Sequence, residues 1–309
     1  MINRELIRLK VVQICYAFHQ NEGRDVDVAE KELMLSMSKS YEMYNLLLLL
    51  LTEVGRMAQR YYEMRVSRLT RLGMENNENP RFVNNLFLKQ LEENLQLKAF
   101  ADSSKYDWSN EYNLVKNLYL QVEQAPFFQS YMESPEQSYE ADREVCRQIY
   151  RTFVCNNDQL DELFEGRSLY WNDDKAIVDT FVLKTINRFT AESTSEQALL
   201  PQFQDDTVQE FAVKLLRHTL NNAAYYDKLI SDQARNWTLE RIALMDRVIM
   251  QVALAEITTF SSIPLSVSIN EYVELAKSYS TPKSGKYVNA TLDHIAKALI
   301  EANKIVKDK

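Results

Sequence analysis

Apolar residues recur three and four positions apart over long stretches of this 309-residue chain. The stretch 242–257 shows the pattern most clearly, with Ile242, Met245, Ile249, Val252, Leu254 and Ile257. This spacing matches the turn of an α-helix that buries one face. The chain holds only five Gly and six Pro, and no alternation of apolar and polar residues indicates a strand. The sequence therefore predicts an all-α fold.

Helical spacing also covers the middle of the chain, where turn-forming residues separate the segments. We expect helices at about 28–72 with a possible break near Ser38, and at about 81–100, 106–124, 137–155 and 173–189. The longest apolar run, Leu46–Leu51, is far shorter than the roughly 18 to 20 residues that a membrane span requires. No charged-then-apolar signal segment opens the chain. We therefore expect a cytoplasmic protein.

Two further helices are predicted near the C-terminus. Ser266 can cap a helix that covers 267–276, because its side-chain oxygen can accept from the first amides. The segment 280–285 contains Pro282 and Gly285, which end that helix. A last helix is expected from about Lys286 to Val306.

Three segments near the end of the chain carry exposed identities that core packing does not require: Trp237–Arg247, Ile263–Lys277 and Lys286–Asp293. In this order and spacing they resemble the C-terminal half of the NusB family of bacterial transcription antitermination factors. The segment Arg8–Tyr16 resembles the first helix of that family, with Val11 and Cys15 replacing the usual alanine and leucine. The resemblance implies a NusB-like helical bundle.

The resemblance divides the chain into three parts. Residues 1–20 correspond to the first helix of the NusB-like core, 21–204 form an acidic helical insertion, and 205–309 form the C-terminal helical core. The insertion holds 20 basic and 30 acidic residues, whereas the other two parts together hold 16 and 14. Because a polyanion is repelled by negative charge, the NusB-like core is the part suited to nucleic acid.

The resemblance also implies partners. NusB proteins pair with NusE, a small ribosomal-subunit protein, and the pair binds the boxA element of nascent transcripts, chiefly of rRNA operons, and loads onto the RNA polymerase elongation complex. Cations and an aromatic–amide pair would bind the single-stranded RNA through phosphate contacts, stacking and base-edge hydrogen bonds. These candidates are Arg4, Arg8, Lys10, Lys283, Lys286, Tyr287 and Asn289. Each could equally be a cap or core residue.

Three acidic residues are candidates for the partner surface by analogy with the family: Glu240, Asp246 and Glu256. Pairing within a helix, for example of Asp246 with Arg241 or Arg247, explains them nearly as well. Two other functions remain open. One is a NusB-like protein-interaction scaffold without RNA binding, and the other is an RNA-binding domain related to rRNA methyltransferases.

Catalytic and metal-binding signatures are absent from the sequence. His19, His218 and His294 lie far apart, and Cys15, Cys146 and Cys155 show no CxxC spacing. We therefore expect no enzyme activity, no cofactor and no metal site.

One basic stretch interrupts the acidic insertion. Arg56, Arg60, Arg65, Arg68 and Arg71 are interleaved with Tyr61 and Tyr62. Arginines beside aromatics can hold phosphates and stack on bases, but they can also pair with the carboxylates of the insertion itself. The second interpretation is favoured by the acidic background.

Overall fold

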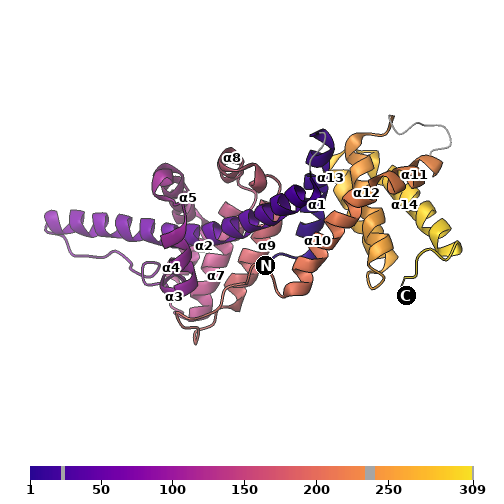
Figure 1. Ribbon diagram of the computed structural model, residues 1–309. Coiled ribbons are helices and arrows are strands. Elements are labelled where there is room, and N and C mark those ends of the chain that lie inside the picture. Colours follow the sequence, from indigo (N-terminus) through magenta and orange to yellow (C-terminus); the bar gives the residue numbers. More distant parts are fainter. Residues whose placement is uncertain (22–24, 234–240, 308–309) are drawn as a thin grey trace. The chain divides into compact units, whose positions relative to one another are not determined.

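The computed structural model describes residues 1–21, 25–233 and 241–307, and every regular element in these ranges is helical (Figure 1). The all-α prediction is confirmed. The helices are α1 (Arg4–Gln20), α2 (Val26–Arg71), α3 (Leu86–Glu93), α4 (Leu95–Ser103), α5 (Tyr112–Gln124), α6 (Pro126–Glu133), α7 (Tyr139–Ile149), α8 (Asp158–Arg167), α9 (Lys175–Arg188), α10 (Asp206–Asn221), α11 (Ala223–Gln233), α12 (Leu244–Thr259), α13 (Leu265–Tyr279) and α14 (Ser284–Glu301). None of these described helices has the length and apolar character that a membrane crossing needs.

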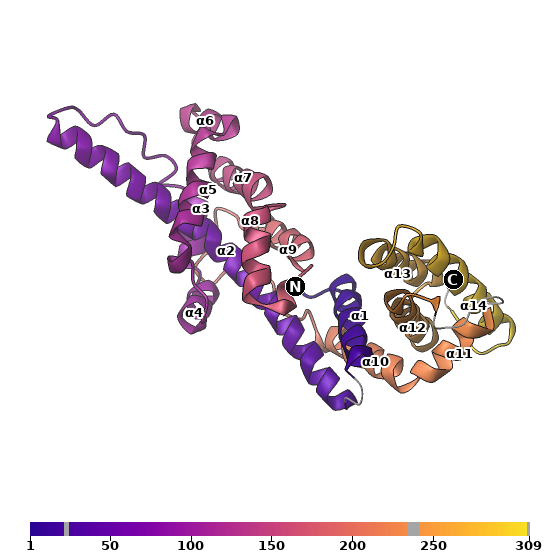
Figure 2. The same ribbon diagram turned by 90° about the horizontal axis from the view of Figure 1, so that it is seen from above.

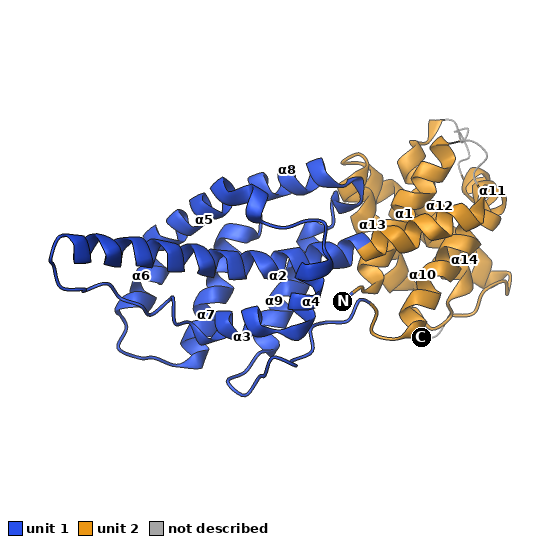
Figure 3. Cartoon of the chain, turned by 60° about the vertical axis from the view of Figure 1, so that its left-hand side comes forward, with its two compact units in different colours: residues 1, 39–202 blue, residues 2–38, 203–309 orange. Residues whose placement is uncertain are grey.

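The chain forms two compact units (Figure 3). Unit 1 consists of Met1 and residues 39–202, and unit 2 consists of residues 2–38 and 203–309. Unit 2 thus includes residues 21–38 in addition to the segments that resemble NusB. Unit 1 holds 18 basic and 25 acidic residues, whereas unit 2 holds 18 and 19. Most of the negative charge therefore belongs to unit 1.

Several predicted boundaries differ from the observed ones. The break near Ser38 is absent, because α2 continues through it while the Ser36 and Ser38 hydroxyls donate to the carbonyls of Leu33 and Leu35. Ser266 does not cap α13. That helix begins one residue earlier at Leu265, and the Pro264 carbonyl accepts from the amides of Val267 and Ser268.

Unit 1 is built around the middle of α2. Leu46, Leu47, Leu48, Leu50 and Leu51 are each at most 1% exposed, so this turn-and-a-half is apolar on all sides and enclosed by the other helices of the unit. Figures 1 and 2 both show α2 running along this unit.

Two tryptophans bind to the backbone of the same helix. The Trp108 indole donates to the Leu46 carbonyl at 2.9 Å, and the Trp171 indole donates to the Lys39 carbonyl at 2.6 Å. The Phe164 ring lies beside both, with centroid distances of 6.1 and 5.3 Å. Because a buried indole N–H requires an acceptor, these hydrogen bonds fix each tryptophan beside one particular residue of α2.

The single helix predicted at 81–100 is divided at Asn94. This residue ends α3 and caps α4, where its side-chain oxygen accepts from the Leu97 amide at 3.0 Å. Its side-chain nitrogen donates to the Gln197 carbonyl at 2.7 Å, and the residue is fully buried. Asn94 therefore caps one helix and anchors the segment that follows α9.

Unit 2 is held together by a buried carboxylate on α12. Glu256 is fully buried and accepts from Arg8 of α1 at 2.8 and 3.0 Å. It also accepts from the hydroxyls of Ser268 and Tyr272 of α13, at 2.7 and 3.0 Å. A second carboxylate, Glu271, accepts from Arg8 at 3.1 Å. These contacts join three helices at one point.

The same contacts change the ionisation of the groups involved. Burial alone would lower the pKa of Arg8, but its hydrogen bond to the Glu256 carboxylate and the negative charge there raise the pKa above its usual value. Burial and the Glu256 charge raise the pKa of Tyr272 well above its usual range. The arginine is therefore charged and the tyrosine neutral, as the hydrogen-bond directions require.

We predict that Asn94→Ala lowers the free energy of unfolding by about 1–3 kcal/mol, because it removes both a helix cap and a buried donor. Asn94→Asp keeps the oxygen that caps α4 but loses the donor to Gln197. Urea unfolding of both variants checks this. Wild-type stability in Asn94→Ala would contradict the assignment.

We predict that Glu256→Gln destabilises unit 2 by about 3–5 kcal/mol, because it leaves the buried Arg8 guanidinium without its main counter-charge. Glu271→Gln is the matched comparison. The Glu271 side chain is 37% exposed, and its loss should cost at most about 1 kcal/mol. Urea unfolding combined with amide exchange in α1 measures both, and equal costs for the two variants would contradict the central role of Glu256.

Candidate nucleic-acid interface

The first turns of α14 present four of the predicted RNA-binding side chains at the surface. Lys283 precedes the helix, Lys286, Tyr287 and Asn289 follow in its first two turns, and all four are exposed. No acidic residue occupies the first turn. The positive end of the helix dipole and the two lysines therefore form a region that favours an anion.

Tyr287 is partly exposed and partly buried. Its side chain is 38% exposed. Burial raises the pKa of its phenol, an interaction with Thr291 opposes the rise, and the nearby Asp246 carboxylate adds to it. The phenol is thus neutral at ordinary pH, and the ring can stack on a base without bringing a negative charge to it.

Asp246 connects the start of α14 to the start of α12. It is buried and accepts from the Ser284 hydroxyl at 2.8 Å, and Ser284 also bonds to Ser280 and Thr281. Gly285 allows α14 to approach α13, because a Cβ at this position would lie 2.8 Å from the Lys277 side chain. These contacts fix the position of the Lys283–Asn289 turn.

The predicted RNA-binding residues of α1 are divided by burial. Arg4 is exposed, and its guanidinium lies 5.2 Å from the centre of the Phe211 ring of α10. Arg8 and Lys10 are 4% and 1% exposed. The structure thus gives Arg8 a structural role in the Glu256 network, and only Arg4 of the three lies at the surface.

Two of the predicted partner-binding residues, Glu256 and Asp246, are buried and bind other side chains of the chain. The Glu256 carboxylate is occupied by Arg8, Ser268 and Tyr272, and Asp246 is occupied by Ser284 rather than by the suggested Arg241 or Arg247. Arg247 instead pairs with Asp227 of α11. Glu240, like Trp237, lies outside the described residues. The role of this acidic set in partner binding stays a prediction.

The structure does not bring the two groups of predicted RNA-binding residues to one point. Arg8 contacts Glu256 in the last turns of α12, whereas Ser284 contacts Asp246 in the first turn of the same helix. Ten residues of helix separate these contacts, which corresponds to about 15 Å along the helix axis. An extended single strand can reach both ends, but a single nucleotide cannot.

A groove in unit 2 contains residues that the sequence interpretation missed. It has a volume of about 510 Å³ and lies among α10, α11, α12, α14 and the residues after α14. Its lining includes Lys214, His218, Tyr225 and Lys304, and no carboxylate. The four-residue spacing of Lys214 and His218 on α10 was the only sequence signal for this groove.

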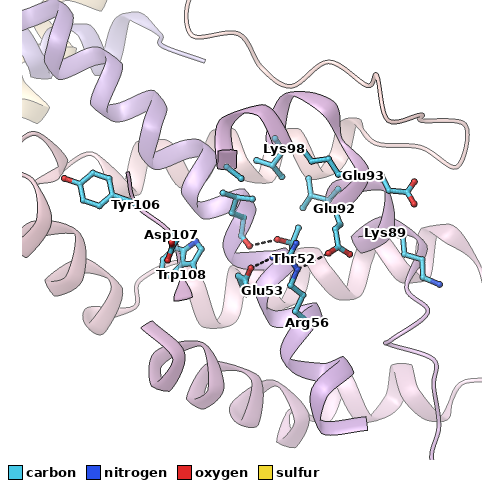
Figure 4. A pocket seen from close by; sticks show the side chains of 14 residues that line it. Thr52, Glu53, Arg56, Lys89, Glu92, Glu93, Lys98, Tyr106, Asp107 and Trp108 are labelled. Carbon is cyan, nitrogen blue, oxygen red and sulfur yellow. Dashed lines mark hydrogen bonds and ion pairs between the residues drawn. The ribbon is translucent and has the colours of Figure 1, made fainter. Parts of the chain in front are cut away.

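Unit 1 contains a cavity of about 440 Å³ beside α2, α3 and α4 (Figure 4). Arg56 is its most prominent cation, and it is already paired with Glu53 at 2.5 Å and with Glu92 at 2.9 Å. The main cation of this cavity is therefore already held by two of the carboxylates that line it.

The three cysteines lie in environments that disfavour the thiolate. Burial raises the pKa of the Cys15 and Cys146 thiols, and it raises that of Cys155 to about 11. Thiols of this kind are poor nucleophiles. The described ranges contain no cluster of three or more His, Cys, Asp or Glu side chains that could hold a metal ion.

Comparison with known proteins identifies relatives of part of this chain. Residues 176–297 match the model of the NusB family. Transcription antitermination protein NusB of Salinibacter ruber is 37% identical over 134 residues, which cover 41% of this chain and 82% of the relative. The protein of the same name from Thermodesulfovibrio yellowstonii is 34% identical over 133 residues, or 43% of this chain and 83% of the relative.

A solved structure of T. maritima NusB is 32% identical and covers 41% of this chain and 80% of that chain, with a TM-score of 0.31. More than half of the present chain lies outside each of the two sequence matches. The NusB proteins of Salinibacter ruber and Thermodesulfovibrio yellowstonii are matched over 82% and 83% of their own length, so the additional residues are extra to most of a family member. The chain therefore belongs to the NusB family.

Proposed function

We propose that this protein acts in transcription antitermination by binding single-stranded RNA with the exposed turn Lys283–Asn289 and with Arg4. Membership of the NusB family and the names of its relatives support the general role. The observation that carries the RNA contact is the grouping of two lysines, an exposed tyrosine and an exposed asparagine at the start of α14.

Each of these groups has a distinct part in the proposed contact. Lys283 and Lys286 bind phosphates together with the first amides of α14. Tyr287 stacks on a base, and Asn289 can both donate to and accept from a base edge. Lysine contacts give no sequence selectivity, so selection of boxA would depend on Tyr287 and Asn289.

We further propose that the RNA is boxA of nascent rRNA-operon transcripts and that a NusE-like ribosomal protein is the partner on the RNA polymerase elongation complex. Arg8 and Lys10 are buried, so the proposed RNA contact does not use them directly. The main alternative is a NusB-like scaffold that binds proteins and no RNA.

We predict that Lys283→Glu with Lys286→Glu weakens binding to a boxA-containing RNA and lowers the slope of log affinity against log salt by about 1.4, since each lost phosphate contact contributes about 0.7. Fluorescence anisotropy over a salt series measures this, with and without the NusE-like partner. The matched control is Lys228→Glu with Lys297→Glu, which changes the same charge at exposed positions on α11 and α14. Equal losses in both variants would indicate an effect of net charge alone.

We predict that Tyr287→Ala reduces the preference for boxA over a scrambled RNA, whereas Tyr287→Phe keeps it, because stacking needs the ring and not the hydroxyl. The ratio of the two affinities is the measurement. Wild-type protein that shows no preference with or without the partner would reject RNA readout and favour the scaffold.

A further inference from the structure

The five arginines at 56–71 fall into two groups in the structure. Arg56 pairs with Glu53 and Glu92, and Arg65 pairs with Glu78 and Glu123. Glu53 belongs to α2 itself, and the other three carboxylates come from α3, α5 and the loop after α2. For these two residues, the interpretation of the basic stretch as pairing within the acidic unit is confirmed.

Arg60, Arg68 and Arg71 form the other group. Among the described residues none of them makes an ion pair, and all three are exposed. With Met64 they recur at steps of four, four and three residues, so they follow one another along a single face of α2. We call this face, residues 60, 64, 68 and 71, the arginine stripe.

Three carboxylates near the arginine stripe have other partners. Glu78 and Glu123, two carboxylates outside α2, pair with Arg65. Glu63 lies one turn from Arg60, and it accepts from Gln59. Met64 is 57% exposed. Because Arg60, Arg68 and Arg71 are exposed and no ion pair occupies them among the described residues, their guanidinium groups are available to an anionic ligand.

Helix α5 adds an aromatic ring beside this stripe. α2 and α5 lie together through the Tyr61–Tyr119 ring contact and the Arg65–Glu123 ion pair. At the edge of this contact, the Arg60 guanidinium lies 6.0 Å from the centre of the Tyr112 ring, which is 46% exposed. Lys116 follows one turn later on α5 and is half-buried.

We propose that the arginine stripe and Tyr112 bind single-stranded RNA outside the boxA element. Guanidinium groups hold successive phosphates, and an exposed ring beside them stacks on a base regardless of its identity. An acidic protein surface could pair with the arginines but would leave the Tyr112 ring without a stacking partner. Single-stranded nucleic acid supplies both phosphates and bases, so it fits the arginine stripe and Tyr112 better. The inference rests on the proposed RNA-binding function and adds a second, sequence-independent contact on unit 1.

The test compares a short RNA that carries boxA alone with a longer RNA that continues beyond boxA on both sides, using the full chain. Wild-type protein should bind the longer RNA more tightly. In Arg60→Glu/Arg68→Glu/Arg71→Glu this gain should disappear, and the salt slope for the longer RNA should fall by about 2, since three phosphate contacts are lost. Binding of the short RNA should not change.

Two controls separate a specific contact from an effect of net charge and test the role of the Tyr112 ring. Lys105→Glu/Arg151→Glu/Lys184→Glu makes the same change of charge at exposed positions elsewhere in unit 1, and it should keep the gain. Tyr112→Ala should reduce the gain, whereas Tyr112→Phe should keep it. Circular dichroism verifies that each variant is folded.

Three outcomes would overturn the inference: no gain from the longer RNA in the wild type, a retained gain in the arginine variant, or an equal loss in the charge control. Failure of the proposed function has a different signature. In that case boxA shows no preference and Lys283→Glu/Lys286→Glu binds the short RNA as the wild type does, while the arginine variant still loses binding to long RNA of any sequence.

Discussion

The buried ion pair between Arg8 and Glu256 is the contact on which unit 2 depends. It joins the first helix of the chain to a helix more than two hundred residues later, and Ser268 and Tyr272 complete the coordination of the carboxylate. A charge pair removed from water is stable only if every remaining donor and acceptor is satisfied. The position of α13 is therefore set by the same carboxylate, and through the close packing at Gly285 so is the beginning of α14.

This network explains why the sequence located the family but could not tell buried cations from exposed ones. Arg4 and Arg8 are one helical turn apart, and periodicity alone treats them as one basic surface. In the structure Arg8 points to Glu256 and Arg4 lies against Phe211. Which of two neighbouring cations is buried depends on a carboxylate far away in sequence, and no local pattern contains that information. The helix at 242–257 was predictable because it depends on local spacing alone.

The remaining differences also have tertiary causes. Asn94 interrupts a helical pattern because its side chain can both cap α4 and reach Gln197, a choice that becomes favourable only when the later segment is present. The five arginines of α2 read as one cluster, yet two of them are neutralised by carboxylates from α3, α5 and the loop after α2. Their division into paired and unpaired groups required the packed unit.

Unit 2 is assembled from two stretches of chain, with unit 1 between them. The entropy cost of bringing the ends of an intervening segment together grows only with the logarithm of its length, by about 0.6 kcal/mol for each doubling. A segment with its own enclosed core, such as the one around Leu46–Leu51, adds its own folding free energy. In evolutionary terms, this site of the family fold can accept a large addition at little cost, and the addition is then free to acquire surfaces under separate selection.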